Sequence, residues 1–168
     1  MKAADVALCP TAKSITHTNA RIKAAAAGTR VVTMPGITMD MLRDGAACAD
    51  YDQVERRTRQ LTERLTHAKH ARIEGADAQG PYAERLGILF DQPENGTIAE
   101  LGIGTNEAAK LCGIILEDEK LYGTVHIAFG TNTSFGGITK ADCHLDGIIL
   151  NPTLYLDDEC IIRKGEFL

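Results

Sequence analysis

The second half of the chain consists of short apolar runs, and this pattern constrains the fold more than any other feature of the sequence. From Thr97 onward, runs such as TIAELGIG, YGTVHIAFG and HLDGIILNP are separated by glycine, proline, asparagine or aspartate. Runs of this length, bounded by turn-forming residues, are typical of β-strands joined by tight turns. We therefore predict a mostly β half over residues 97–168.

The first 74 residues follow a different pattern, in which strands alternate with helices. DVALC is a short apolar run that stops at Pro10, THTNARIKAAAAG predicts a helix with Thr16 as its N-cap, and TRVVTM predicts a second strand. Strand, helix and strand in this order form a βαβ unit with parallel strands. A further helix is predicted from Asp50, followed by the short strand ARIE. The apolar stripe of this helix consists of Val54, Thr58, Leu61, Leu65 and Ala68.

A change of composition separates the two halves. GADAQGPYA, at residues 75–83, contains two glycines and a proline, which predicts a loop or linker, and PYAERLGILF then predicts a short helix. The expected fold class is α/β (α+β), with an α/β half at 1–74, a linker and short helix at 75–96, and a β-rich half at 97–168. A chain of 168 residues is long enough to bury one core, so we expect one compact domain.

Composition excludes several classes of protein. The formal net charge is −5, which argues against nucleic acid or an anionic membrane as a partner. No stretch is apolar over the 18 or so residues that a membrane span requires. The five cysteines are odd in number and lack CxxC spacing, which favours free thiols in a reducing cytoplasm. We expect a cytoplasmic protein.

Candidate metal ligands follow from the alternation of side chains along strands, where successive residues point to opposite faces. In TVHIAF the large apolar side chains share one face, and His126 lies on the other face between Thr124 and Ala128. The same rule places His144 and Asp146 on one face of HLDG. One sheet face should therefore carry imidazole and carboxylate groups with space around them.

Glu100 adds a second carboxylate, because it interrupts the otherwise apolar strand TIAELGIG. An isolated buried carboxylate is costly, so it should be paired or metal-bound. Glu100, His126, His144 and Asp146 are accordingly predicted to hold a divalent metal ion. Mixed imidazole and carboxylate ligands suit zinc, cobalt, manganese or ferrous iron, and such an ion can activate water or polarise a carbonyl.

Each of these residues also has a purely structural interpretation. His126 could be a hydrogen-bonded strand residue, Glu100 could pair with Lys110, and Asp146 before Gly147 is an ordinary turn signal. The glycine-rich GIGTNEAAK lacks both the GxGxxG and the GK[ST] patterns of nucleotide-binding loops.

The remaining polar groups are interpreted structurally. ILEDEK, at residues 115–120, is interpreted as an exposed turn or helix end, and His17, His67 and His70 as surface residues. Cys143, although next to a candidate ligand, is interpreted as a small buried apolar residue.

Three segments that occur in order also carry a family resemblance: IAELGIGTN, EDEKLYGTVHIAFGTNTSFGG and HLDGIILNPTLYLD. They resemble the leucyl aminopeptidase family of the aminopeptidase T and aminopeptidase S type, which are dinuclear metallopeptidases with 2,5-dihydroxypyridine dioxygenases among their relatives. The resemblance extends over ALCPTAKSITHTNARIKAAAAGTRVVTMPGITMDML. It implies a metal site with ligands at Glu100, His126, His144 and Asp146.

The chain departs from the family pattern in two places. It has no counterpart to a central segment that carries a further glutamate ligand, and Glu84 lies in a helical pattern that does not replace it. Where the family peptidases have a catalytic tyrosine, GTNTSF offers Thr131, Thr133 and Ser134. Catalytic residues therefore stay unassigned.

Three functions remain open on these observations. The resemblance implies a metal-dependent aminopeptidase-like hydrolase, in which zinc or cobalt activates water against peptide N-termini. The alternative is a mononuclear ferrous dioxygenase of the dihydroxypyridine type, because His126, His144 and Asp146 form a 2-His-1-carboxylate set. The third is a shortened, non-catalytic metal-binding or assembly protein. The expected partners are a peptide or small-molecule substrate and further copies of the chain, since apolar surface left exposed favours self-association.

Overall fold

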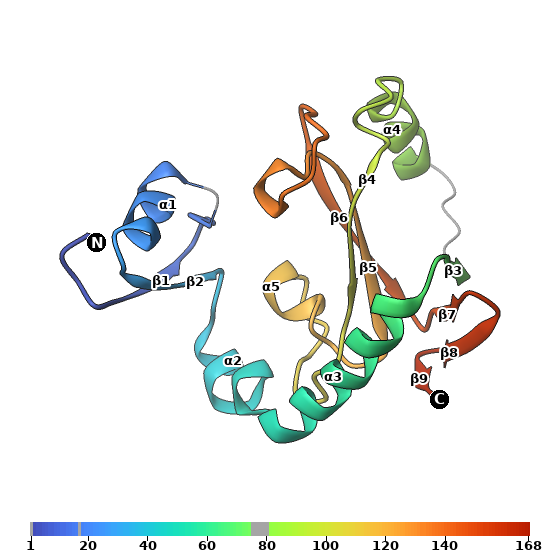
Figure 1. Ribbon diagram of the computed structural model, residues 1–168, viewed down its shortest axis with the longest axis horizontal. Coiled ribbons are helices and arrows are strands. Elements are labelled where there is room, and N and C mark those ends of the chain that lie inside the picture. The colour runs from blue at the N-terminus through green and yellow to red at the C-terminus, as the bar shows by residue number, and fades with distance from the viewer. Residues whose placement is uncertain (1, 17, 75–80) are drawn as a thin grey trace.

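The computed structural model describes residues 2–16, 18–74 and 81–168, and Figure 1 shows how its elements are arranged. Helices and strands alternate in the first half and strands dominate the second, which confirms the predicted α/β class. The central part of the predicted linker and His17 lie outside the described residues. Within the described residues, no helix has both the length and the apolar character needed to cross a membrane.

The N-terminal residues form the predicted βαβ unit. It consists of β1 (Val6–Thr11), α1 (Asn19–Ala26) and β2 (Arg30–Pro35), and β1 pairs with β2 in parallel. The helix begins two residues later than predicted, because the hydroxyl of Thr18 accepts the hydrogen bond from the Arg21 amide. The hydroxyl of Thr16 instead donates to the hydroxyl of Thr33 at 2.8 Å, which ties the loop after β1 to β2.

Two helices and a short 3₁₀ turn follow this unit: α2 (Met39–Asp44), η1 (Ala46–Cys48) and α3 (Tyr51–His67). The helix predicted from Asp50 is α3, and the Asp50 carboxylate caps it by accepting from the amides of the second and third residues of the helix. Leu61 is the buried residue of the predicted stripe, whereas Leu65 is 37% exposed.

A three-stranded antiparallel sheet forms the centre of the second half. It has the order β4 (Ile98–Ile103), β5 (Thr124–Gly130) and β6 (His144–Leu150), so β5 has a neighbour on both sides. Helix α4 (Pro81–Leu89), predicted from PYAERLGILF, precedes β4. The short helix α5 (Ile115–Asp118) lies between β4 and β5 in the chain, and η2 (Thr133–Phe135) lies between β5 and β6.

A second antiparallel sheet joins the two halves of the chain. Its order is β3 (Ala71–Glu74), β7 (Thr153–Leu156), β8 (Glu159–Arg163) and β9 (Glu166–Phe167). Strand β3 comes from the first half and pairs with β7 from the second. The core brings together this sheet, α3 and the central sheet through Leu61, Val125, Leu154, Leu156, Ile161 and Ile162.

The two faces of the central sheet have different roles. Ile103, Val125 and Ile127 pack against the hydrophobic core, and burying such a side chain stabilises the fold by about 1.5–3 kcal/mol. Because side chains alternate, His126 and Ala128 lie on the opposite face. The core therefore fixes the strands whose other face carries the candidate ligands.

Candidate metal centre

Strand register brings the two predicted carboxylates together around a small residue. Ala128 of β5 is directly opposite Glu100 of β4 on one side and Asp146 of β6 on the other. Directly opposed residues of antiparallel strands share a face of the sheet. Ala128 is fully buried and has only a methyl group, so it leaves space between the two carboxylates.

The two histidines lie on the same face, one on either side of Ala128 along the strand direction. His126 is two residues before Ala128, and His144 is directly opposite Gly130. His126 is itself opposite Gly102, and a Cβ at that glycine would lie 1.9 Å from Cε1 of the imidazole. Only a glycine at position 102 therefore lets the ring take its place over β4.

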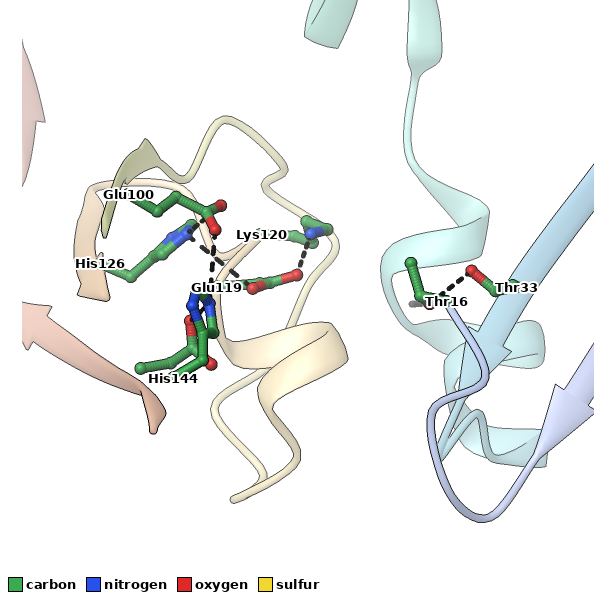
Figure 2. A network of polar contacts seen from close by, with 8 residues as sticks. Thr16, Thr33, Glu100, Glu119, Lys120, His126 and His144 are labelled. Carbon is green, nitrogen blue, oxygen red and sulfur yellow. Dashed lines mark hydrogen bonds and ion pairs between the residues drawn. The ribbon is translucent and has the colours of Figure 1, made fainter. Parts of the chain in front are cut away.

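Each of the four predicted ligands lies within 4.0 Å of at least one other, and Figure 2 labels three of them. Nε2 of His126 is 3.2 Å from one oxygen of Glu100. Nε2 of His144 is 3.8 Å from the other oxygen of Glu100 and 3.7 Å from Asp146. Four side chains from three strands thus point at one small volume.

A backbone contact orients one imidazole. Nδ1 of His144 lies 2.8 Å from the carbonyl oxygen of Thr131, so an N–H at this position donates to that oxygen. Nε2, which is the unprotonated nitrogen when the ring is neutral, faces the carboxylates of Glu100 and Asp146. Metal-binding histidines commonly have such an arrangement, in which the second nitrogen donates to a backbone oxygen.

The ligating atoms form two overlapping groups, each within 4.8 Å. One group is Glu100, His144 and Asp146, and the other is Glu119, His126 and Asp146. Asp146 belongs to both. The three residues considered for a ferrous site do not form one group: His144 belongs to the first group, His126 to the second, and Asp146 to both.

Glu119 was missed by sequence reasoning, because ILEDEK is acidic and has the composition of an exposed turn. The segment is α5 and its C-terminal end, but Glu117 and Asp118 are buried. The side chain of Glu119 is only 18% exposed, forms an ion pair with Lys120, and has one oxygen 3.9 Å from Nε2 of His126. No spacing rule connects this residue to the strands, so only the fold reveals it.

The structural alternative for Glu100 is not the arrangement found. Lys110 lies 2.5 Å from Asp44 instead, and this hydrogen bond and charge lower the pKa of the Asp44 carboxyl. Nδ1 of His126 is buried and has no hydrogen-bond partner among the described residues. The other nitrogen of the ring, Nε2, faces the carboxylates of Glu100 and Glu119, and imidazole and carboxylate are donors that suit a divalent cation.

The donor face opens into a cavity of about 770 Å³. Glu100, Glu119, His144 and Asp146 line one side of it. The opposite side comes from the βαβ unit, including Thr16 and Thr33, which Figure 2 shows across from the cluster. The centre is therefore accessible to a small molecule.

An α/β fold with an imidazole and carboxylate cluster beside a cavity defines a candidate metal-dependent protein. The chain is similar to 2,5-dihydroxypyridine 5,6-dioxygenase from Pseudomonas putida, with 31% identity over 86 residues. That segment is 46% of this chain and 25% of the relative's length. No family model matches the chain.

A solved structure extends the similarity of the fold over nearly the whole chain. The structure of 2,5-dihydroxypyridine dioxygenase from Pseudomonas putida matches 99% of this chain and 72% of its own chain, with a TM-score of 0.74. Sequence identity is 18%, so this match concerns the fold. The sequence relative and the structural neighbour are both enzymes by name.

These comparisons correct the assignment made from the sequence. The prediction of an aminopeptidase-family hydrolase that acts in proteolysis is wrong, because the sequence relative and the structural neighbour are both dihydroxypyridine dioxygenases. The error has a physical reason. The segments AELG, HIAFG and HLD encode strands and the candidate donors on them, and one fold can support different reactions.

Proposed function

We propose that this chain is a metal-dependent, ring-cleaving dioxygenase that acts on a hydroxylated pyridine. The observation that carries the proposal is the cluster of imidazoles and carboxylates beside the cavity, taken with the 31% identity to a dihydroxypyridine dioxygenase. The matched segment is a quarter of that relative, so activity and substrate are both part of the proposal.

The residues present fit a ferrous ion. Asp146, together with Glu100 and His144 on one side or Glu119 and His126 on the other, would hold it, because imidazole nitrogen and carboxylate oxygen are the donors of non-haem iron sites. When bound, ferrous iron supplies the redox chemistry by which molecular oxygen reacts with an electron-rich aromatic ring.

The protein's own contribution is to orient the candidate donors and the substrate ring. The carbonyl of Thr131 fixes the ring of His144, and the absence of a side chain at Gly102 leaves room for His126. Lys120 holds Glu119 by an ion pair at the edge of the donor set. Apolar side chains of Pro35 and Ile114 line the cavity and would contact the faces of a flat ring.

Oxygen consumption tests the proposed reaction. Anaerobically purified protein is loaded with ferrous iron and mixed with 2,5-dihydroxypyridine, and the uptake of oxygen and the loss of the aromatic absorbance are followed. We expect both in wild type. Asp146→Asn should lose at least roughly a hundredfold in rate, as for removal of a metal-site partner. Asp142→Asn, four residues away and outside both donor groups, should retain the rate.

Two negative outcomes are distinguishable. If iron binds but oxygen uptake does not depend on the pyridine, the chain is a metal-binding protein without this activity. If iron does not bind, the donor assignment itself is wrong. Either result would overturn the proposed dioxygenase.

A further inference from the structure

The cavity has a second polar wall, opposite the metal donors, to which no role has yet been given. We propose that the hydroxyl of Thr33, oriented by Thr16, binds a polar substituent of the substrate on the side of the cavity opposite the candidate metal donors, and so selects a doubly hydroxylated ring. This inference rests on the proposed function, because it specifies the substrate of the same site.

The position of the pair in the fold is that of a ligand-binding edge. Strands β1 and β2 are parallel, and Thr16 follows the carboxyl end of β1 while Thr33 lies near the carboxyl end of β2. In parallel sheets, ligands bind in the crevice outside these carboxyl ends. Ala12, Ser14 and Gly36, from the same two ends, line the cavity with them.

The hydrogen bonding of the pair leaves capacity for a ligand. Thr16 donates its hydroxyl proton to Thr33 at 2.8 Å. The Thr33 hydroxyl accepts this bond, so its own proton remains to be donated, and no acceptor for it is recorded among the described residues. A hydroxyl oxygen can accept two bonds and donate one. Thr33 can therefore donate to an oxygen of a ligand in the cavity.

The two walls together define the chemistry of the occupant. One wall carries the candidate metal donors, where a bound ion would attract a ligand oxygen, and the other offers a hydroxyl donor. Pro35, Ile114 and Ile115 lie along the cavity and favour an apolar body between the two ends. A planar ring with oxygen substituents on opposite sides satisfies all three features, whereas a ring with one oxygen satisfies two.

Ligand binding without turnover tests the inference. Iron-loaded protein is titrated anaerobically with 2,5-dihydroxypyridine, 2-hydroxypyridine and 3-hydroxypyridine. The preference is defined as the dissociation constant of the tighter-binding monohydroxypyridine divided by that of 2,5-dihydroxypyridine. We expect Thr33→Val to reduce this preference roughly tenfold, as for one lost hydrogen bond to a ligand. Thr16→Val should reduce it less, because Thr16 orients Thr33.

Matched variants separate recognition from a structural role. Thr33→Ser keeps the hydroxyl and should restore the preference. Thr11→Val removes a hydroxyl of the same unit that bonds the Lys13 carbonyl and does not line the cavity, and should leave the preference unchanged. If Thr33→Val weakens all three ligands equally while lowering the melting temperature, its role is structural and the inference is wrong.

The binding experiment can distinguish a failure of this inference from a failure of the proposed dioxygenase reaction. A preference for 2,5-dihydroxypyridine that depends on Thr33, without any oxygen uptake, would support this inference and contradict the proposed reaction. A wild-type protein that takes up iron but binds the three pyridines equally would overturn this inference, whatever its reaction.

Discussion

Gly102 shows how one residue without a side chain can shape the candidate site. The imidazole of His126 occupies the space where any other residue would place its Cβ. Two glycines, Gly102 and Gly104, follow Glu100 in the sequence, and either could leave such space. Which glycine mattered depended on the register between β4 and β5, which sequence alone does not fix.

Replacing this glycine gives a prediction at the residue scale. Gly102→Ala should displace the His126 ring and weaken metal binding at least roughly tenfold, comparable to disturbing a ligand's orientation. Isothermal titration with ferrous iron or cobalt measures the affinity. Gly147→Ala is the matched control, because an added Cβ there would have its nearest neighbour at 3.7 Å. Equal affinities in the two variants would contradict the account.

Four of the five side chains that the structure gathers at the candidate site were predicted from residue patterns. Glu100, His126, His144 and Asp146 were found because strands alternate and because a charged residue in an apolar strand requires a partner. Glu119 could not be found in this way, since its position depends on how α5 packs beside the sheet. Its acidic neighbours give the segment the composition of exposed surface.

At the scale of elements, helix α3 carries the contact that joins the two sheets to the N-terminal half. Leu61 of α3 is 6% exposed and belongs to the same core cluster as Val125 of β5 and Leu154 of β7. The stripe predicted from helical periodicity was therefore correct in direction. Leu65, which belongs to the same predicted stripe, is 37% exposed. Helical periodicity predicts which face of a helix is buried but not how wide the buried stripe is.

These two leucines provide a matched pair for a stability measurement. Leu61→Ala should lower the free energy of unfolding by roughly 2–5 kcal/mol, as expected for a cavity in the core. Leu65→Ala should lower it by less than about 1 kcal/mol, because the side chain is partly solvated. Urea denaturation followed by circular dichroism gives both values. Similar losses in the two variants would show that α3 does not pack as described.

The elements themselves were largely predictable, and their partners were not. The βαβ unit, the helix capped by Asp50 and the strands around HIAFG and HLDG follow from local patterns. The pairing of β3 with β7 joins segments about 80 positions apart, and no local pattern encodes such a contact. The same limitation explains why Thr16 was predicted only as a helix cap and why its hydrogen bond to Thr33 was not expected.

At the scale of the whole molecule, the cavity lies between the βαβ unit and the central sheet, so a bound metal should stabilise the folded chain. At a hundredfold excess over the dissociation constant, a ligand that binds only the folded state contributes about 2.7 kcal/mol. For a chain of this size this corresponds to a rise of about 5–10 °C in melting temperature. We expect a chelator to reverse the rise in wild type. No such difference should appear in His144→Ala, and a chelator effect of equal size in that variant would place the metal elsewhere.

Counting the ferrous ions bound per chain tests the central claim most directly. Anaerobic equilibrium dialysis of wild type, Glu100→Gln, His126→Ala, His144→Ala and Asp146→Asn, with His70→Ala as the control outside the cluster, gives the number of ions and their affinity. The account predicts one tightly held ion in wild type and in the control, and a weakened or absent ion in each of the other four variants. Wild-type binding that persists in all four, or a wild type that holds no ion, would contradict it.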